Sequence, residues 1–499
     1  MRIRDNITAR YHAIFSYTGL ILIYCGVLMF SPLLALLGWP EEWKHSLAFI
    51  IPAAMLTAIG IFMRKAFRPK DRLLTLQEAG VIVVLSWLFA CIFAAWPFMV
   101  VQGLNFTQAI FESVSGYTTT GLTVVDVTKA THLVLLWRSI TQLIGGAGLV
   151  IIMLAAITGP TGGGLSTAEG RTEQLVPHVR HSARLVAALY LGYAALGILG
   201  YRLAGMTLFD AVNHSFTAVA TGGFSTKPNS IAYYNSAAIE AVSIPLMLLG
   251  SINFILIYQL IQGKPKPLLK NGEIRLVSVV IPLSVAILMI FVFSGISPLV
   301  EKSFRVGVFE CVSALSGTGF QSTTYERWSP LGLLVLTLLM LTGGGTCSTA
   351  GGIKQYRIYL LLKSVWWEFK RPFMPRSAII ERPVWLGENQ SFVNDRMVRH
   401  AAVYVVIYIL TFLAGAAALS LIAPGYSLGQ YMFEFASAQG NVGQSVNITK
   451  PDSPSLLLWT ETAGMLLGRL EFFVIFVSIV KIARDFVAVT RARHVPKPL

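Results

Sequence analysis

Four stretches of this chain end in a glycine that follows hydroxyl, amide or other small residues: 118–121, 221–223, 317–319 and 441–443. Nine positions before each final glycine stands a titratable residue, namely Glu112, His214, Glu310 or Glu434. Chance glycine clusters would not keep one offset, so the four stretches are copies of an internal repeat.

The residue types of these stretches suit the binding of a bare cation. Glycine permits backbone conformations closed to other residues, and a ring of backbone carbonyls can replace the water shell of a cation. The alternative is that the glycines only allow close packing of membrane helices, but the shared offset favours the ring. The residue nine positions before each final glycine also has two interpretations. It is either an exposed acid that offsets the dipole at the start of a half-helix, or a direct cation ligand.

The composition places these stretches in a membrane. Hydrophobic residues make up 55% and charged residues 13% of the 499 residues, far from the usage of a soluble domain. A crossing helix needs about 20 apolar residues. Ten such segments are predicted, the first of them a retained helix and not a signal peptide: 12–38, 46–63, 76–101, 133–158, 185–206, 237–261, 274–296, 330–362, 398–422 and 456–480.

The distribution of charge predicts the orientation. Lys and Arg gather at the N-terminus and around 64–72, 171–184, 264–275, 363–399 and 491–497, which alternate with the crossings. Because cytoplasmic loops hold the excess of basic residues, both termini are expected in the cytoplasm and the glycine stretches on the outer side. The net charge of +15 then needs no nucleic-acid partner, since contact with anionic lipid explains it.

The ten crossings and four stretches predict an all-α polytopic membrane protein. Two N-terminal helices (1–74) precede four units of helix, re-entrant half-helix, irregular loop and helix, arranged around a pseudo-fourfold pore. We place the units at 75–170, 171–270, 271–397 and 398–499.

The third unit contains a second unusual stretch. Residues 343–352 place five glycines inside the longest apolar segment, which no continuous helix would favour at roughly 1 kcal/mol per glycine. The helix is expected to break there, and a broken helix beneath a pore is suited to gating. A phosphate-binding loop is the alternative, but it would need a Gly-Lys-Ser/Thr ending and a preceding strand.

Two basic residues accompany this stretch. Arg469 lies about 20 Å along its predicted helix, near the middle of the bilayer, where a charge usually faces a cavity or a partner. It is either a structural pair with an acid or with carbonyls, or a pore-facing cation that contacts 343–352. Lys354 is an interfacial anchor that helps to hold the gate.

Other chemistry is weakly supported. His178 and His181 could ligate a metal, but no third ligand is apparent, and the cysteines Cys25, Cys91, Cys311 and Cys347 have no paired spacing. Without a nucleophile beside a base, a Walker motif or a haem spacing, an embedded enzyme is the poorest hypothesis.

The loops SGYTTTGL, ATGGFST and SGTGFQST, with TGGGTCSTAGGIK and MLLGRLEFF, resemble the Trk/Ktr/HKT superfamily of potassium transporters over roughly residues 75 to 490. The N-terminal helices and the length are more similar to the Trk branch than to Ktr. The resemblance implies a potassium selectivity filter formed by Thr119, Thr120, Gly121, Thr221, Gly222, Gly223, Gly317, Thr318, Gly319, Asn441, Val442 and Gly443. It implies a gate formed by Gly343, Gly344, Gly345, Thr346, Cys347, Ser348, Thr349, Ala350, Gly351, Gly352, Lys354 and Arg469.

The resemblance further implies potassium uptake through a gated, channel-like pore in the bacterial inner membrane, with proton- or sodium-coupled symport as the alternative. Gly121, where sodium-permeable relatives have serine, implies a preference for potassium, whereas the fourth loop lacks the family's Thr-Gly-Phe pattern. The implied assembly is a homodimer on cytosolic TrkA-type subunits, which would carry the ATP or NAD and meet the basic loops at 64–72, 170–184 and 363–399. No cofactor besides transported potassium is expected in this chain.

Overall fold

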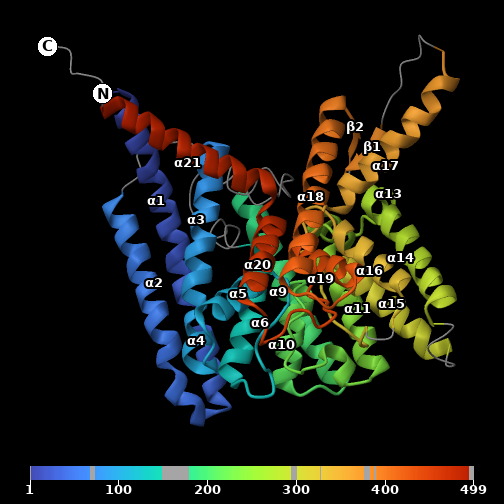
Figure 1. The fold of residues 1–499 in the computed structure, drawn as a ribbon, viewed down its shortest axis with the longest axis horizontal. Coiled ribbons are helices and arrows are strands. Elements are labelled where there is room, and N and C mark those ends of the chain that lie inside the picture. Colours follow the sequence, from blue (N-terminus) through green and yellow to red (C-terminus); the bar gives the residue numbers. More distant parts are fainter. Residues whose placement is uncertain are drawn as a thin grey trace.

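The computed structural model describes residues 2–67, 74–148, 179–293, 300–325, 328–375, 383–386 and 389–493. These residues are almost entirely helical (Figure 1). In the described part, strands occur only as one antiparallel hairpin of β1 (Pro383–Leu386) and β2 (Asn389–Phe392).

Two N-terminal helices lie side by side at one edge of the molecule (Figure 1). They are α1 (Arg2–Leu28) and α2 (Leu47–Ala66), joined by the 3-10 helices η1 (Ser31–Leu37) and η2 (Pro40–His45). A Cβ on either Gly19 or Gly60 would lie within 3.0 Å of the other's carbonyl oxygen. The two helices therefore pack backbone against backbone, as small residues allow in membranes.

Four helix, half-helix and helix units follow, as predicted from the repeats. The first helices are α3 (Leu76–Ala94, extended by α4, Trp96–Gln102), α9 (Val179–Leu203), α14 (Gly272–Phe291) and α18 (Asp395–Ile422). The half-helices are α5 (Phe106–Tyr117), α10 (Leu208–Val219), α15 (Val300–Ser316) and α19 (Leu428–Gly440). The second helices are α6 (His132–Ala147), α11 (Ala237–Ser251), α16 (Pro330–Thr342) and α20 (Ser455–Leu470).

The remaining helices continue or connect these units. They are α12 (Phe254–Ile261), α13 (Lys266–Lys270), α17 (Gln355–Lys370), α21 (Phe472–Arg493) and the 3-10 helices η3 (Ser230–Tyr233) and η5 (Arg371–Phe373). In Figure 1, α21 crosses over α3 toward the side where both termini lie.

The half-helices start at side-chain caps. Asn105 accepts the amide of Gln108 at the start of α5, Thr207 accepts that of Asp210 before α10, and Ser427 accepts that of Gln430 before α19. These caps satisfy amides that have no partner within the helix. At 12 to 13 residues, the three half-helices are too short to cross a bilayer.

The second helices break more often than predicted. The expected crossing at 237–261 is wrong as one helix, because α11 and α12 meet at 110°. The expected crossing at 456–480 breaks at Glu471, whose φ is +57°. In the segment predicted at 133–158, α6 ends at Ala147, Gly148 has a φ of +87°, and the residues beyond lie outside the described part.

These breaks lower the number of helices that could each cross a membrane unbroken. Among the described residues, six helices are long and apolar enough to cross a membrane, or seven with the bent pair α11 and α12. The expectation of one unbroken helix is therefore wrong for 237–261 and for 456–480, whereas the break inside 330–362 was predicted. The apolarity of the second helices was evident in the sequence, but the polar residues at which they turn were not weighed.

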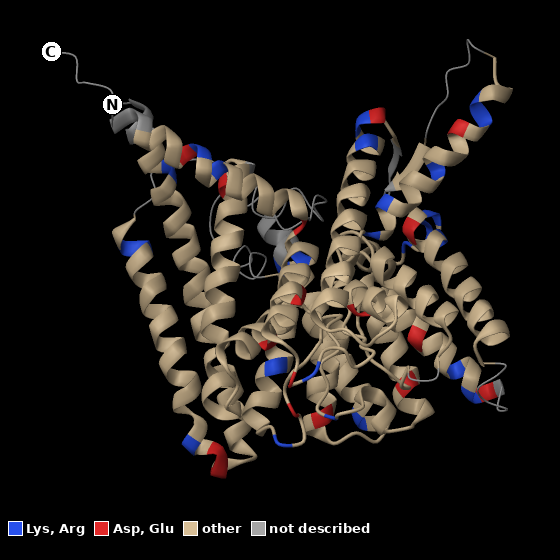
Figure 2. Ribbon diagram, in the orientation of Figure 1, with Lys and Arg blue, Asp and Glu red and all other residues tan. Residues whose placement is uncertain are grey.

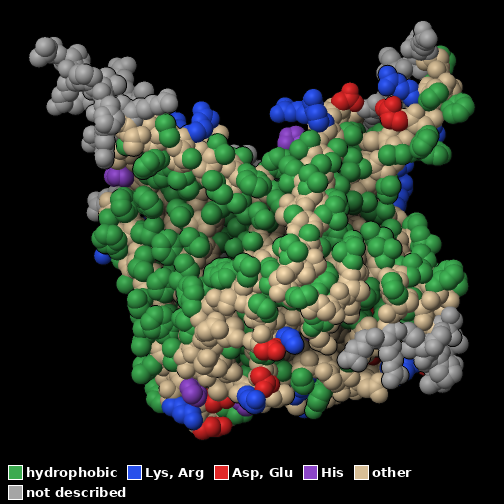
Figure 3. All heavy atoms as spheres, viewed as in Figure 1, with side chains coloured by type: hydrophobic (Ala, Val, Ile, Leu, Met, Phe, Trp, Pro, Cys, Tyr) green, Lys and Arg blue, Asp and Glu red, His purple; other side chains and the backbone are tan. Residues whose placement is uncertain are grey.

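The outer surface of the bundle is apolar around its middle (Figure 3). Charges concentrate toward the two ends, and both ends carry Lys, Arg, Asp and Glu, with Lys and Arg predominating at the edge that holds both termini (Figure 2). Buried polar residues instead gather inside, on the half-helices and their loops. This is the distribution expected of a bundle whose outside meets lipid and whose polar groups face an internal path.

Candidate functional site: a ring of four loops

The loops after the four half-helices close into a ring. A Cβ built on the final glycine of each loop would lie well under 3.0 Å from a carbonyl oxygen of the next loop. The contacts run in one direction, from Gly121 to Gly222, Gly223 to Thr318, Gly319 to Val442, and Gly443 back to Thr120. Each carbonyl belongs to the residue just before the next loop's glycine. Four loops therefore surround one axis, with no room for a side chain at the four glycines.

The four loops also share one backbone conformation. In each loop the final glycine and the residue two positions before it have φ values between +51° and +97°, whereas the residue between them does not have a positive φ. The residues at the earlier position are Thr119, Thr221, Gly317 and Asn441. Because non-glycine residues avoid this region, its recurrence shows that the surroundings impose it.

Hydrogen bonds turn the loop carbonyls away from the half-helices. In each loop the middle residue donates its N–H to the carbonyl of a hydroxyl residue on the half-helix. The pairs are Thr120 with Ser115 (2.9 Å), Gly222 with Thr217 (2.8 Å), Thr318 with Ser313 (3.1 Å) and Val442 with Ser437 (2.9 Å). The C=O and N–H of one trans peptide point in opposite directions. The carbonyls of Thr119, Thr221, Gly317 and Asn441 therefore face away from the half-helices, as a carbonyl-lined axis requires.

These hydroxyl residues were missed in the sequence. They stand six positions before the final glycine in all four repeats, so an alignment of the repeats on that glycine would have found them.

The fourth loop keeps the shared geometry despite its different sequence. Asn441 takes the left-handed position, and its Nδ2 donates to Thr120 Oγ1 at 3.0 Å and to the Met465 carbonyl at 2.9 Å. The second loop departs more, because Gln142 Nε2 donates to the Gly222 carbonyl at 2.6 Å. One carbonyl of the ring therefore already has a protein donor.

The residues nine positions before each final glycine form hydrogen bonds with the segment that follows the loop. Glu112, Glu310 and Glu434 accept the backbone N–H of the residue twelve positions later at 3.0, 2.7 and 2.9 Å. In the second repeat, His214 Nε2 lies 2.9 Å from Ser225 Oγ. All four side chains are 0% exposed, so the exposed-acid interpretation is wrong. Their oxygens are occupied by protein donors, which does not support direct cation binding either.

Repeat four contains a further buried acid, Glu461. Its Oε1 accepts from Thr449 Oγ1 at 2.8 Å, and the N–H of Thr449 donates to Glu434 at 3.0 Å. Within the described part of the chain, its Oε2 has no hydrogen-bond partner, although the residue is 0% exposed. Two buried carboxylates that share one threonine repel each other if both are ionised.

We expect Glu461→Gln to leave the free energy of unfolding unchanged or higher, because an amide removes this repulsion. Glu434→Gln is the matched comparison. It should lower that free energy by roughly 1–3 kcal/mol, because its NH₂ group would face loop donors. Thermal unfolding in detergent measures both variants. A loss of stability in Glu461→Gln as large as in Glu434→Gln would contradict this assignment.

The predicted break of the third repeat's helix is confirmed. α16 ends at Thr342, Gly343 has a φ of +70°, and α17 starts at Gln355. The segment 343–354 lies against two of the four loops of the ring. Thr349 Oγ1 is 3.0 Å from Thr221 Oγ1, and a Cβ on Gly351 would lie within 3.0 Å of Asn441 and of the Gly440 carbonyl.

Polar side chains fix this segment. Glu273 accepts the N–H of Thr346 at 2.8 Å, Gln355 Nε2 donates to the Gly343 carbonyl at 3.0 Å, and Lys354 Nζ donates to the Ala350 carbonyl at 2.5 Å. Glu273 and Gln355 were not predicted from the sequence.

Arg469 connects the segment to the first repeat. Its guanidinium donates to the Thr349 carbonyl and to the Gly145 carbonyl at the end of α6, the latter at 2.5 Å. A cavity of about 40 Å³ is lined by Arg469, Lys354 and residues of the segment. Arg469 therefore binds backbone carbonyls, as one interpretation predicted, and one of these carbonyls belongs to the segment 343–352.

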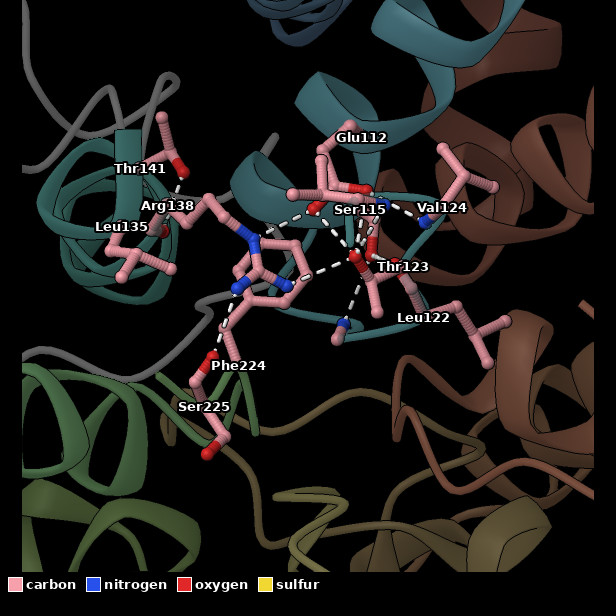
Figure 4. Close-up of polar contacts among 12 residues, drawn as sticks. Glu112, Ser115, Leu122, Thr123, Val124, Leu135, Arg138, Thr141, Phe224 and Ser225 are labelled. Carbon is pink, nitrogen blue, oxygen red and sulfur yellow. Dashed lines mark hydrogen bonds and ion pairs between the residues drawn. The ribbon is translucent and has the colours of Figure 1, made fainter. Parts of the chain in front are cut away.

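A charged residue that the sequence analysis missed is Arg138 on α6 (Figure 4). It is 2% exposed and pairs with Glu112 at 2.8 Å. The available signal was an arginine inside an apolar segment, at 133–158.

Of the two histidines weighed as weak metal ligands, His178 lies outside the described residues and the side chain of His181 is not described. Within the described ranges, no group of three His, Cys, Asp or Glu side chains is placed to hold a metal ion.

Residues 45–487 match the model of the TrkH family, described as a cation transport protein. The chain belongs to this family. Among TrkH-family relatives, an uncharacterized cation transporter of Methanocaldococcus jannaschii is 30% identical, over 86% of this chain and 88% of its own length. The Trk system potassium uptake protein TrkG of Escherichia coli is 30% identical, over 90% of this chain and 93% of its own. TrkH of Halomonas elongata is 29% identical, over 92% and 96%.

The fold agrees with the TrkH family as well. The crystal structure of the potassium transporter TrkH from Vibrio parahaemolyticus matches with a TM-score of 0.82 at 26% identity, over 94% of this chain and 98% of that one. The prediction of an all-α membrane protein of four repeats is thereby confirmed, and so is the predicted superfamily.

Proposed function

We propose that this TrkH-family chain takes up potassium through the ring formed by its four loops. The observation that carries the proposal is the cyclic contact of each final glycine with the carbonyl of the next loop. Carbonyl oxygens at close range replace the hydration shell of a cation that has lost its water. The filter residues are those predicted from the sequence, and the names of the relatives favour potassium as the ion.

We assign gating to the segment 343–352 with Lys354 and Arg469. The segment lies beneath two filter loops, and Arg469 places a positive charge beside it. A cation that passes the filter must therefore pass this segment and an electrostatic barrier. Opening requires that the bonds of Thr349 to Thr221 and to Arg469 be exchanged for others.

We favour channel-like flux over proton- or sodium-coupled symport. A coupled carrier commonly alternates access around a fixed site near the middle of the bilayer, whereas the ring is formed by backbone atoms held in place. A negative interior would drive entry by about 2.3 kcal/mol per charge per 100 mV.

The proposed setting is the bacterial inner membrane, with both termini in the cytoplasm. The basic edge that holds the termini supports this orientation (Figure 2). We retain the proposed homodimer, the repeat boundaries 75–170, 171–270, 271–397 and 398–499, and a cytosolic TrkA-type subunit as the carrier of any nucleotide.

The proposal is tested by rubidium uptake into liposomes that contain the purified chain. We expect uptake to follow an imposed negative interior potential, to be inhibited by potassium far more than by sodium, and to be unaffected by an added pH gradient. Uptake that requires the pH gradient would replace the channel with a proton symporter. Equal inhibition by sodium and potassium would overturn the assignment of the ring as a potassium filter.

A further inference from the structure

Arg138 is a buried charged residue beside the ring that the proposed transport does not use. It lies within α6 and is 2% exposed. A charge at such a site persists only with partners that replace water. The partners of Arg138 therefore indicate its role in the structure.

Its partners belong to two different filter loops (Figure 4). Nε donates to Glu112 Oε1 at 2.8 Å, and Nη2 donates to Thr123 Oγ1 at 3.0 Å, both in the first repeat. Nη1 donates to the carbonyl of Ser225, in the second repeat, at 2.9 Å. The guanidinium carbon also lies 4.0 Å from the centre of the Phe224 ring. One planar group thus holds both loops.

The points of contact occupy equivalent positions. Thr123 follows Gly121 by two residues, and Ser225 follows Gly223 by two residues. Between these points lies the contact of Gly121 with the Gly222 carbonyl. The distance across the guanidinium therefore sets the spacing of the first two loops where their carbonyls meet.

The other junctions between neighbouring loops use weaker contacts. Ala232 N–H donates to the Gln321 carbonyl, Gln444 Nε2 donates to Glu310, and Asn441 Nδ2 donates to Thr120. In the part of the chain that the structure describes, only the junction of the first and second loops is bonded by a buried arginine. Arg138 is held by its ion pair with Glu112 inside the first repeat and donates from there to the second. This junction is the most rigidly specified of the four, because charge-assisted bonds from a planar fork fix direction as well as distance.

We propose that Arg138 is a positioning residue for ion selectivity. It holds the first and second loops at the spacing that gives the carbonyl ring its size, and it does not touch the ion. The inference rests on the proposed function of the ring. It predicts that the geometry of the guanidinium matters as well as its charge.

Two variants separate geometry from folding. Arg138→Lys keeps the positive charge but cannot donate in three directions from one plane. The double variant Glu112→Gln with Arg138→Gln removes both charges, so that no unpaired charge is left buried. Arg305→Gln is the control, since Arg305 forms a similar pair with Glu240 at 2.9 Å, away from the filter loops and 30% exposed.

The readout is the ratio of rubidium to sodium flux in liposomes, with thermal stabilisation by potassium over sodium in detergent as a second measure. We expect Arg138→Lys and the double variant to lose about tenfold in the flux ratio, the discrimination that a charge-assisted bond provides, and to lose the preferential stabilisation by potassium. Arg305→Gln should keep both.

Wild-type ratios in both Arg138 variants would overturn the inference. So would an equal loss in Arg305→Gln, because selectivity would then follow general stability. Failure of the proposed function is distinguishable, since the unmodified chain would itself show no preference for rubidium. If a variant cannot be reconstituted, the stabilisation measured in detergent decides.

Discussion

Gly121→Ser should lower the preference for potassium over sodium by at least about tenfold, equivalent to about 1.4 kcal/mol. Gly121 has a φ of +97°, and a Cβ there would press on the Gly222 carbonyl. The side chain must displace this carbonyl or move its own loop, since overpacking of this kind costs about 1–3 kcal/mol. Either movement changes the size of the ring. Competition between rubidium and sodium for uptake measures the effect.

Gly205→Ser is the matched control for strain. Gly205 has a φ of +102°, but a Cβ there would meet nothing within 4 Å. It therefore carries the same backbone cost, about 1–2 kcal/mol, without a collision. Equal selectivity in Gly121→Ser and the unmodified chain would contradict the ring, and equal losses in both variants would assign the effect to general strain.

Arg469→Gln should raise rubidium flux by roughly tenfold while leaving the ratio of potassium to sodium unchanged. The substitution removes a positive charge beside the path, and an interaction of about 1–4 kcal/mol between unit charges is typical near a protein surface. It also weakens the contact of the guanidinium with the Thr349 carbonyl. The electrostatic barrier and the bond that holds the segment 343–352 are therefore both weakened, whereas the carbonyl ring keeps its structure.

Arg202→Gln provides the comparison. Arg202 lies in the last turn of α9 and, among the described residues, donates only to the nearby Met206 carbonyl. Its flux should equal that of the unmodified chain. Flux that falls in Arg469→Gln would show that the arginine supports the pore and does not obstruct it. A changed ion ratio would show that the gate and the filter are not separate devices.

The sequence was sufficient for the repeats and their loops. One offset between a titratable residue and a glycine located all four loops, and the glycine-rich interruption located the break after Thr342. These features can be recognised in a sequence because the offset repeats and because the glycines interrupt an otherwise apolar segment. Even the divergent fourth loop was located, since Gly443 kept its place.

The hydrogen-bond and ion-pair partners of the buried polar residues could not be predicted from the sequence. The exposed-acid interpretation of Glu112 was wrong because burial depends on a loop that folds back twelve residues later. The break at Glu471 is supported by Arg357, which lies 3.0 Å away but 114 positions earlier in the chain. The partners of Arg138 likewise come from two repeats that meet only in the folded chain. Local periodicity contains no information about such contacts.

The central claim is that the four loops bind potassium through backbone carbonyls. The most direct test is a crystal structure of this chain with thallium(I), a heavy mimic of potassium, recorded for anomalous scattering. We predict anomalous density on the axis enclosed by the carbonyls of Thr120, Gly222, Thr318 and Val442, and its loss when excess potassium, but not excess sodium, is added. Thallium bound elsewhere, with none between the four loops, would contradict the account.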